Sequence, residues 1–139
     1  MNFVKGKTKI KSFPKSASVT FTAGNLVMLT GGYVTTATTQ SVKHQGIILQ
    51  SVASTDADFA SNTKVLVECP AEQSAEFEAD VSGTLAITSV GSKFDLSDAS
   101  TVNQAGTTYQ VVTCTGFISS SKGRFALNTY NNIVDKSNE

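Results

Sequence analysis

Apolar and acidic side chains alternate without interruption along Ala75-Glu76-Phe77-Glu78-Ala79-Asp80-Val81. Successive side chains of an extended chain point to opposite faces, so the four apolar residues share one face and the three acids share the other. A helix would scatter the acids around its circumference. The segment therefore predicts a half-buried β-strand with Phe77 and Val81 toward the core and an acidic outer face.

Short strand patterns separated by turn residues continue on both sides of this segment. Apolar or alternating runs cover 18–22, 26–30, 33–37, 46–52, 64–69, 85–87, 93–96, 109–118 and 124–128. Gly31-Gly32 lies between two of these runs and indicates a two-residue hairpin turn, because both glycines accept a positive φ. About nine short strands predict an all-β fold, a small β-barrel or β-sandwich over residues 19–128.

The two ends of the chain differ from this domain. Lysines occupy every second position from Lys5 to Lys11, which places them on one side of an extended chain. Pro14 ends any helix there. Residues 1–18 are therefore interpreted as an extended basic N-terminal arm that becomes ordered on a partner, or as a disordered basic tail, and the barrel is expected to fold without residues 1–15. Residues 129–139 are interpreted as a C-terminal tail.

Charge is divided between the two halves of the chain. Residues 1–55 hold six lysines and no acid, whereas residues 56–98 hold nine acids and two lysines. Opposite charges steer association, so we expect contacts with further copies of the chain or with a larger partner. The candidate contact residues are Lys5, Lys7, Lys9, Lys11, Lys15, Glu76, Glu78 and Asp80. The alternative is that the two charged regions lie against each other within one fold.

The sequence contains no motif that brings together the acid, base and nucleophile of a catalytic site. The single histidine, His44, stands between Lys43 and Gln45, which predicts an exposed polar side chain. The motifs of serine hydrolases, phosphate-binding loops and Cys-x-x-Cys sites are absent from the sequence. A hydrolase that used only the carboxylates would lack a nucleophile and its orienting partners. We therefore expect a protein that is not an enzyme, with no catalytic residue and no cofactor.

Metal, nucleic-acid and membrane partners are not expected either. Asp56 and Asp58 offer two oxygens to a cation, but their spacing lacks the remainder of a calcium loop. The net charge is zero, and only Phe3 and Phe13 lie among the N-terminal lysines, which is a poor platform for nucleic acid. No apolar run approaches the ~20 residues of a membrane span, and no signal-peptide pattern follows the first lysines.

The two cysteines predict buried thiols. Cys69 and Cys114 each lie inside an apolar run, where free cysteine behaves as a small hydrophobic residue. Two cysteines do not form a disulfide framework, and we expect the chain to fold in a reducing cytoplasm.

The order of several features resembles that of the capsid decoration (cement) proteins of tailed bacteriophages. These features are Phe21-Thr22-Ala23-Gly24-Asn25-Leu26-Val27, Gly31-Gly32-Tyr33, Gly46-Ile47-Ile48, Ser54-Thr55-Asp56-Ala57-Asp58-Phe59-Ala60, Lys64-Val65-Leu66-Val67, Val90-Gly91-Ser92-Lys93-Phe94-Asp95-Leu96-Ser97-Asp98, Gly116-Phe117-Ile118 and Gly123-Arg124-Phe125-Ala126-Leu127-Asn128. The resemblance spans residues 19–128.

This resemblance implies a structural protein of the virion, made in the host cytoplasm and bound to the outer capsid surface. Such a protein would bridge subunits of the major capsid protein and reinforce the lattice, as a homo-oligomer such as a trimer where capsid subunits meet. An N-terminal arm is typical of that arrangement. The alternative is a head-fibre or tail-associated binding module that contacts a receptor or glycan, although the chain has no Trp for such a site.

Overall fold

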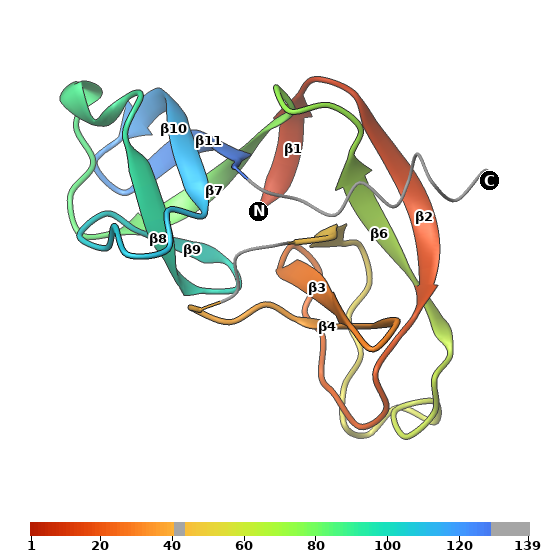
Figure 1. Cartoon of the computed structure of the whole chain (residues 1–139). Helices are drawn as coiled ribbons and strands as arrows, with labels where there is room; N and C mark the ends of the chain where they lie inside the picture. Colours follow the sequence, from red (N-terminus) through yellow and green to blue (C-terminus); the bar gives the residue numbers. More distant parts are fainter. Residues whose placement is uncertain (41–43, 129–139) are drawn as a thin grey trace.

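The computed structural model describes residues 1–40 and 44–128, so Lys43 and the expected tail at 129–139 lie outside the described residues. The described part forms eleven strands and one short 3₁₀ helix, arranged as two β units side by side (Figure 1). In chain order the elements are β1 (Asn2–Lys5), β2 (Thr8–Pro14), β3 (Leu26–Thr30), β4 (Tyr33–Thr36), β5 (Gly46–Ile48), β6 (Lys64–Pro70), β7 (Glu76–Ser82), η1 (Ile87–Ser89), β8 (Lys93–Asp98), β9 (Thr101–Asn103), β10 (Val112–Ser119) and β11 (Lys122–Leu127).

The C-terminal barrel consists of β7, β8, β9, β10 and β11. These strands pair in the order β7-β11-β10-β8-β9, and β9 also pairs in parallel with β7, from Asp80↔Thr101 to Ser82↔Asn103. The five strands therefore close into a ring, which gives each strand two neighbours and directs alternate side chains inward. Phe77, Phe125 and Leu96 are among the buried residues that fill its core.

The N-terminal barrel consists of β2, β3, β4, β5 and β6, which pair in the order β2-β6-β5-β3-β4. The sheet curls until the end of β2 reaches β4, where Lys15 forms a bridge with Val34 and the Ser16 N–H donates to the Val34 carbonyl at 2.8 Å. The core of this barrel includes Phe13, Val27 and Val67. The N-terminal barrel thus closes at one end of β2.

Both barrels are joined through the first residues of the chain. β1 pairs with β7 of the C-terminal barrel, whereas β2 pairs with β6 of the N-terminal barrel. The Met1 ammonium donates to the Gly24 carbonyl at 2.8 Å, and the Leu26 N–H donates to the Ala99 carbonyl at 2.7 Å. Leu26 and Ile47 pack in the same buried cluster as the C-terminal core. The two barrels therefore share a buried contact.

The fold class is confirmed as an all-β barrel, but the first 18 residues are not an arm separate from the domain. They are extended, yet residues 2–14 form two paired strands, one in each sheet. Removing residues 1–15 would take away a strand from each sheet, which argues against the prediction that the barrel folds without them. The lysine alternation correctly indicates an extended chain, but the pattern does not reveal the strands that pair with it.

The remaining sequence predictions have mixed outcomes. The strand over 75–81 is confirmed as β7, with Phe77 and Val81 buried. The Gly31-Gly32 turn joins β3 to β4 with φ values of 58° and 90°. The prediction of a strand over 85–87 is wrong, because the chain enters η1 at Ile87. The run at 18–22 is reduced to a bridge between Phe21 and Val52. β9 was not predicted.

Replacing Phe77 by alanine should lower the free energy of unfolding by about 3–5 kcal/mol, because a large core side chain is lost where the barrel cannot collapse. Phe77 is fully buried, and its ring centroid lies 5.9 Å from that of Phe3 and 6.3 Å from that of Phe125. Denaturant melts measure the change. The matched control is Glu78→Gln on the outer face, which should cost within about 0.5 kcal/mol. A larger loss in the control would contradict the assigned strand orientation.

Candidate functional site

Lys5 lies in β1 and contacts the acidic strand of the same chain. Its Nζ is 3.8 Å from the Glu76 carboxylate, with the Lys5 side chain 71% exposed and that of Glu76 17% exposed. An exposed pair of this kind contributes about 1 kcal/mol or less. Thr8 of β2 donates to Glu68 at 2.7 Å, and the Lys7 N–H donates to Glu72 at 3.1 Å. The basic and acidic regions thus meet in part within one fold, as the alternative interpretation of the charge pattern expected.

The other acids of β7 are also placed by the fold. Glu76 accepts a hydrogen bond from the Thr115 hydroxyl at 2.6 Å, and Glu78 lies 3.9 Å from the Arg124 guanidinium. Asp80 is exposed, opposite Lys122 of β11 in the register. Two of the three acids therefore have partners on neighbouring strands of the same chain.

Lys7, Lys9 and Lys11 form the feature that we call the β2 lysine edge. Lys9 is exposed and Lys11 is half-buried, opposite Cys69 and Val67 of β6. The Lys11 amine lies 5.5 Å from the Phe13 ring centroid, a cation–π distance. In the described part of the chain, the two ion pairs use Lys5 and Arg124 and none of these three lysines. Within the described residues, the β2 lysine edge therefore presents positive charge that takes part in no ion pair.

Lys15 does not belong to this edge, and its expected role as a surface contact is wrong. It is fully buried, and its amine donates to the carbonyls of Phe59 at 2.9 Å and Ser61 at 2.6 Å. The Lys15 backbone pairs with the same loop through Thr63 and Asn62. Because Lys15 follows the last residue of β2, at the point where β2 meets β4, its side chain lies under the 53–63 loop and holds it in place.

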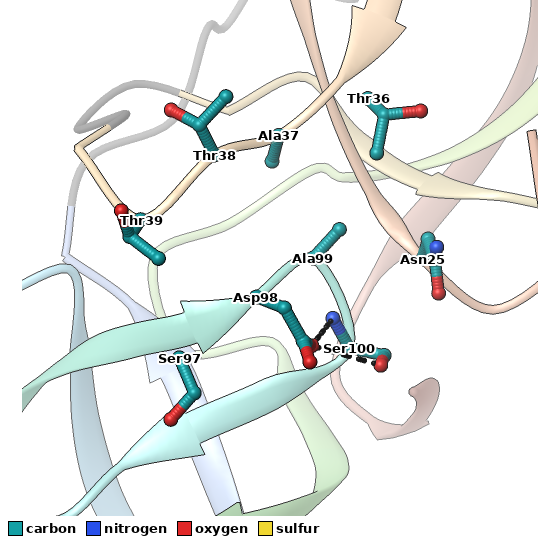
Figure 2. Close-up of a pocket in the computed structure, with 9 residues that line it drawn as sticks. All are labelled: Asn25, Thr36, Ala37, Thr38, Thr39, Ser97, Asp98, Ala99 and Ser100. Atoms are coloured by element: carbon teal, nitrogen blue, oxygen red, sulfur yellow. Dashed lines mark hydrogen bonds between the residues drawn. The ribbon is translucent and has the colours of Figure 1, made fainter. Parts of the chain in front are cut away.

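A hollow of about 520 Å³ lies where the two barrels meet (Figure 2). One wall consists of Asn25 and residues 36–39 of the N-terminal barrel, and the other consists of residues 97–100 at the turn from β8 to β9. The Asp98 carboxylate accepts from the Ser100 N–H at 2.8 Å and from its hydroxyl at 3.0 Å. Burial alone would raise the pKa of Asp98, but hydrogen bonds from Ser100 and Thr101 outweigh this effect and lower it. The lining offers hydroxyl, amide and carboxylate groups to a polar ligand.

His44 is buried, so the prediction of an exposed side chain is wrong. Residues 44 and 45 lead into β5, which lies in the middle of its sheet between β3 and β6, and the Gln45 N–H donates to the Val27 carbonyl at 2.8 Å. His44 and Gln45 are buried together with all three residues of β5, so this part of the chain is covered on both faces despite its polar side chains. Burial lowers the pKa of His44 to about 4, so the imidazole is neutral at pH 7.

The cysteines are buried free thiols, as predicted. Cys69 belongs to the N-terminal core and Cys114 to the C-terminal core. Burial raises the pKa of Cys69 to about 11 and also raises that of Cys114. Neither thiol is activated as a nucleophile would be.

The carboxylates of the 53–63 loop stabilise the loop itself. Asp56 accepts from the Ala53 N–H at 2.9 Å, and Asp58 accepts from the Thr63 hydroxyl at 2.9 Å. Over residues 1–40 and 44–128, no three His, Cys, Asp or Glu side chains gather as a metal site would need. The oxygens of Asp56 and Asp58 act in local turns.

Asp95 is a buried carboxylate that sequence reasoning missed. It accepts from the N–H groups of Thr108 at 2.9 Å, Tyr109 at 2.7 Å and Gln110 at 2.7 Å. Three donors on one carboxylate fix the loop that leads into β10. An aspartate inside an otherwise apolar strand, Phe94-Asp95-Leu96, is the signal in the sequence that such a partner exists.

Replacing Lys15 by methionine should lower the free energy of unfolding by about 1–3 kcal/mol, because the carbonyls of Phe59 and Ser61 lose their donor. Denaturant melts and limited proteolysis of the 53–63 loop measure the two effects. The matched control is Lys9→Met, an exposed change expected to stay within about 0.5 kcal/mol. Equal effects of the two substitutions would show that the Lys15 amine does not hold the loop.

Acid should destabilise the protein through His44. The unfolded chain binds a proton at His44 near pH 6.5, whereas the folded chain binds it only near pH 4, so unfolding takes up a proton between these values. The free energy of unfolding should therefore fall by about 2 kcal/mol from about pH 7.5 to about pH 5. His44→Gln should remove that part of the slope. Parallel pH profiles for the two proteins would contradict a buried neutral His44.

No model of a known protein family matches the sequence, and no curated protein is significantly similar to it. No helix in the described part of the chain is long and apolar enough to cross a bilayer. The geometry described above gives two candidate surfaces for function: the β2 lysine edge and the hollow between the barrels.

Proposed function

We propose that this chain is a non-enzymatic structural protein of a phage virion, which binds the outer capsid surface and reinforces the lattice by bridging subunits of the major capsid protein. The observation that carries the proposal is the β2 lysine edge. Over residues 1–40 and 44–128, Lys5 and Arg124 form ion pairs with carboxylates of the chain, whereas Lys7, Lys9 and Lys11 form none and are available to a partner. A surface of this kind steers association with an acidic surface.

The two-barrel shape supports a bridging role. The barrels share a buried contact and are held together by β1 and β2, so they form one body that can touch two neighbouring subunits at once. Each contact can then be weak, because the second forms at a high effective concentration once the first is made. Many copies bound to a symmetric lattice, as trimers where capsid subunits meet, would repeat these paired contacts and so add to the stability of the lattice. The protein would be made in the host cytoplasm and reside on the outer surface of the virion.

The hollow between the barrels favours the second candidate, a head-fibre or tail-associated module for a receptor or glycan. Its hydroxyl, amide and carboxylate groups suit the hydrogen-bonding groups of a sugar (Figure 2). The nine residues that line it include no aromatic side chain on which a sugar ring could stack. The β2 lysine edge therefore supports the capsid role more strongly than the hollow supports glycan binding.

Neutralising the β2 lysine edge tests the proposal. The triple substitution Lys7→Gln, Lys9→Gln and Lys11→Gln should slow association with virions from which this protein alone has been removed, by about tenfold. Added salt should slow the association of the unsubstituted protein in the same way. Lys93→Gln, at another exposed lysine, is the matched control and should associate as the natural sequence does.

Counting copies in purified virions separates the two candidate functions. Hundreds of copies per particle support lattice reinforcement, whereas a few copies support a fibre or tail role. Absence from virions, or association that neither salt nor the triple substitution alters, would contradict the proposal.

A further inference from the structure

β2 has one paired edge and one open edge. The register with β6 places Lys7 opposite Ala71 and Lys15 opposite Thr63, and both pairs are hydrogen-bonded. Hydrogen-bonded pairs alternate along an antiparallel ladder, so the odd-numbered residues of β2 bond to β6. The even-numbered residues point their N–H and C=O groups away from β6, as Ser16 does when it bonds to Val34.

The open stretch lies at Thr8, Ile10 and Ser12. The described residues place no strand beside this part of β2, since β4 reaches only its far end at Lys15. Pro14 occupies the next outward-facing position, where a missing N–H breaks no bond to β6. The main-chain groups of three consecutive outward positions are thus exposed to a partner.

Side chains on the two faces of this open edge differ in chemistry. Ile10 is 62% exposed, and Leu66 of β6, on the same face, is 41% exposed. Lys9 and Lys11 lie on the other face. A strand laid along this edge would meet Ile10 flanked by the small polar side chains of Thr8 and Ser12 with every second side chain, and the positive charge of Lys9 and Lys11 with the others.

We infer that β2 accepts an extended segment of another protein as an additional antiparallel strand, and that this segment alternates acidic and apolar residues. Main-chain hydrogen bonds to Ile10 and Ser12 would supply affinity, and the alternating side chains would supply selectivity. The inference concerns how any partner meets β2 and does not depend on the capsid role.

A second copy of the chain does not fit this edge. Antiparallel pairing of β2 with β2 of a second copy would bring the lysines of the two copies together, which is unfavourable. The chain's own alternating acidic strand, β7, is engaged by β11 on one side and by β1 and β9 on the other. Lysines on an open edge also discourage self-association, so the same charge both excludes copies and selects an acidic partner.

A synthetic peptide of about ten residues that alternates Glu and Val, with blocked ends, is a direct probe. In an antiparallel pair, residues bonded to Ile10 have their side chains on the face of Ile10, so the Val residues make the main-chain bonds. N-methylation of the Val residues should weaken binding at least about tenfold, whereas N-methylation of the Glu residues should leave it nearly unchanged. Fluorescence anisotropy with the whole chain measures each affinity.

Substitutions in β2 provide the complementary test. Ser12→Pro removes an outward N–H but no bond to β6, so the peptide affinity should fall at least about tenfold while circular dichroism stays native. Lys9→Gln with Lys11→Gln should abolish the preference for the Glu/Val peptide over a Lys/Val peptide. Equal binding of the two N-methylated peptides, or no preference of the natural sequence for Glu/Val over Lys/Val, would overturn the inference, whether or not Ser12→Pro folds.

Discussion

The antiparallel pairings of the first fourteen residues hold this structure together. β1 lies on β7 of one barrel and β2 lies on β6 of the other, with the turn at Gly6 between them. Gly6 has a φ of 89°, and a Cβ there would come within 2.7 Å of the Ala75 Cα. The chain can therefore pass from one barrel to the other at this point only with glycine, beside the connection from β6 to β7. Two crossings that run in opposite chain directions, 6–7 and 71–75, tie the barrels at the same place.

These pairings also sort the N-terminal lysines, which the sequence presents as equivalent. Lys5 falls on β1 and faces Glu76, Lys15 falls beyond β2 and is buried under a loop, and Lys9 and Lys11 remain on an edge. The difference arises from position along the two strands and not from residue type. A lysine whose amine finds two carbonyls can be buried, because an ammonium group needs several hydrogen bonds and not necessarily a carboxylate.

Sequence reasoning recovered those features that depend on local pattern. β7 alternates without a fault, so its two faces were predicted correctly, and Gly31-Gly32 permits its turn by itself, so the position of the hairpin was predicted correctly. The pairing of β2 with β6 joins residues that lie 62 positions apart at Thr8↔Pro70 and 50 apart at Pro14↔Lys64, and no local pattern encodes that register. The burial of His44 and Lys15 likewise depends on segments from elsewhere in the chain, which for Lys15 is the 53–63 loop. β9 has three residues, too few for an alternation to be recognised.

The open edge of β2 combines two requirements that usually conflict. An exposed strand edge that carries an apolar side chain such as Ile10 invites pairing with other chains, and a protein present at high local concentration must prevent it. Covering the edge would prevent pairing but would also remove the binding surface. Lys9 and Lys11 lie on the face opposite Ile10 and leave the main chain of β2 open. Whether an approaching strand pairs with β2 then depends on the charge of that strand. Selectivity then comes from repulsion of the wrong partner as much as from attraction of the right one. Selective binding at the open edge requires that β2 be fixed along its other edge, and the complete ladder with β6 fixes it there.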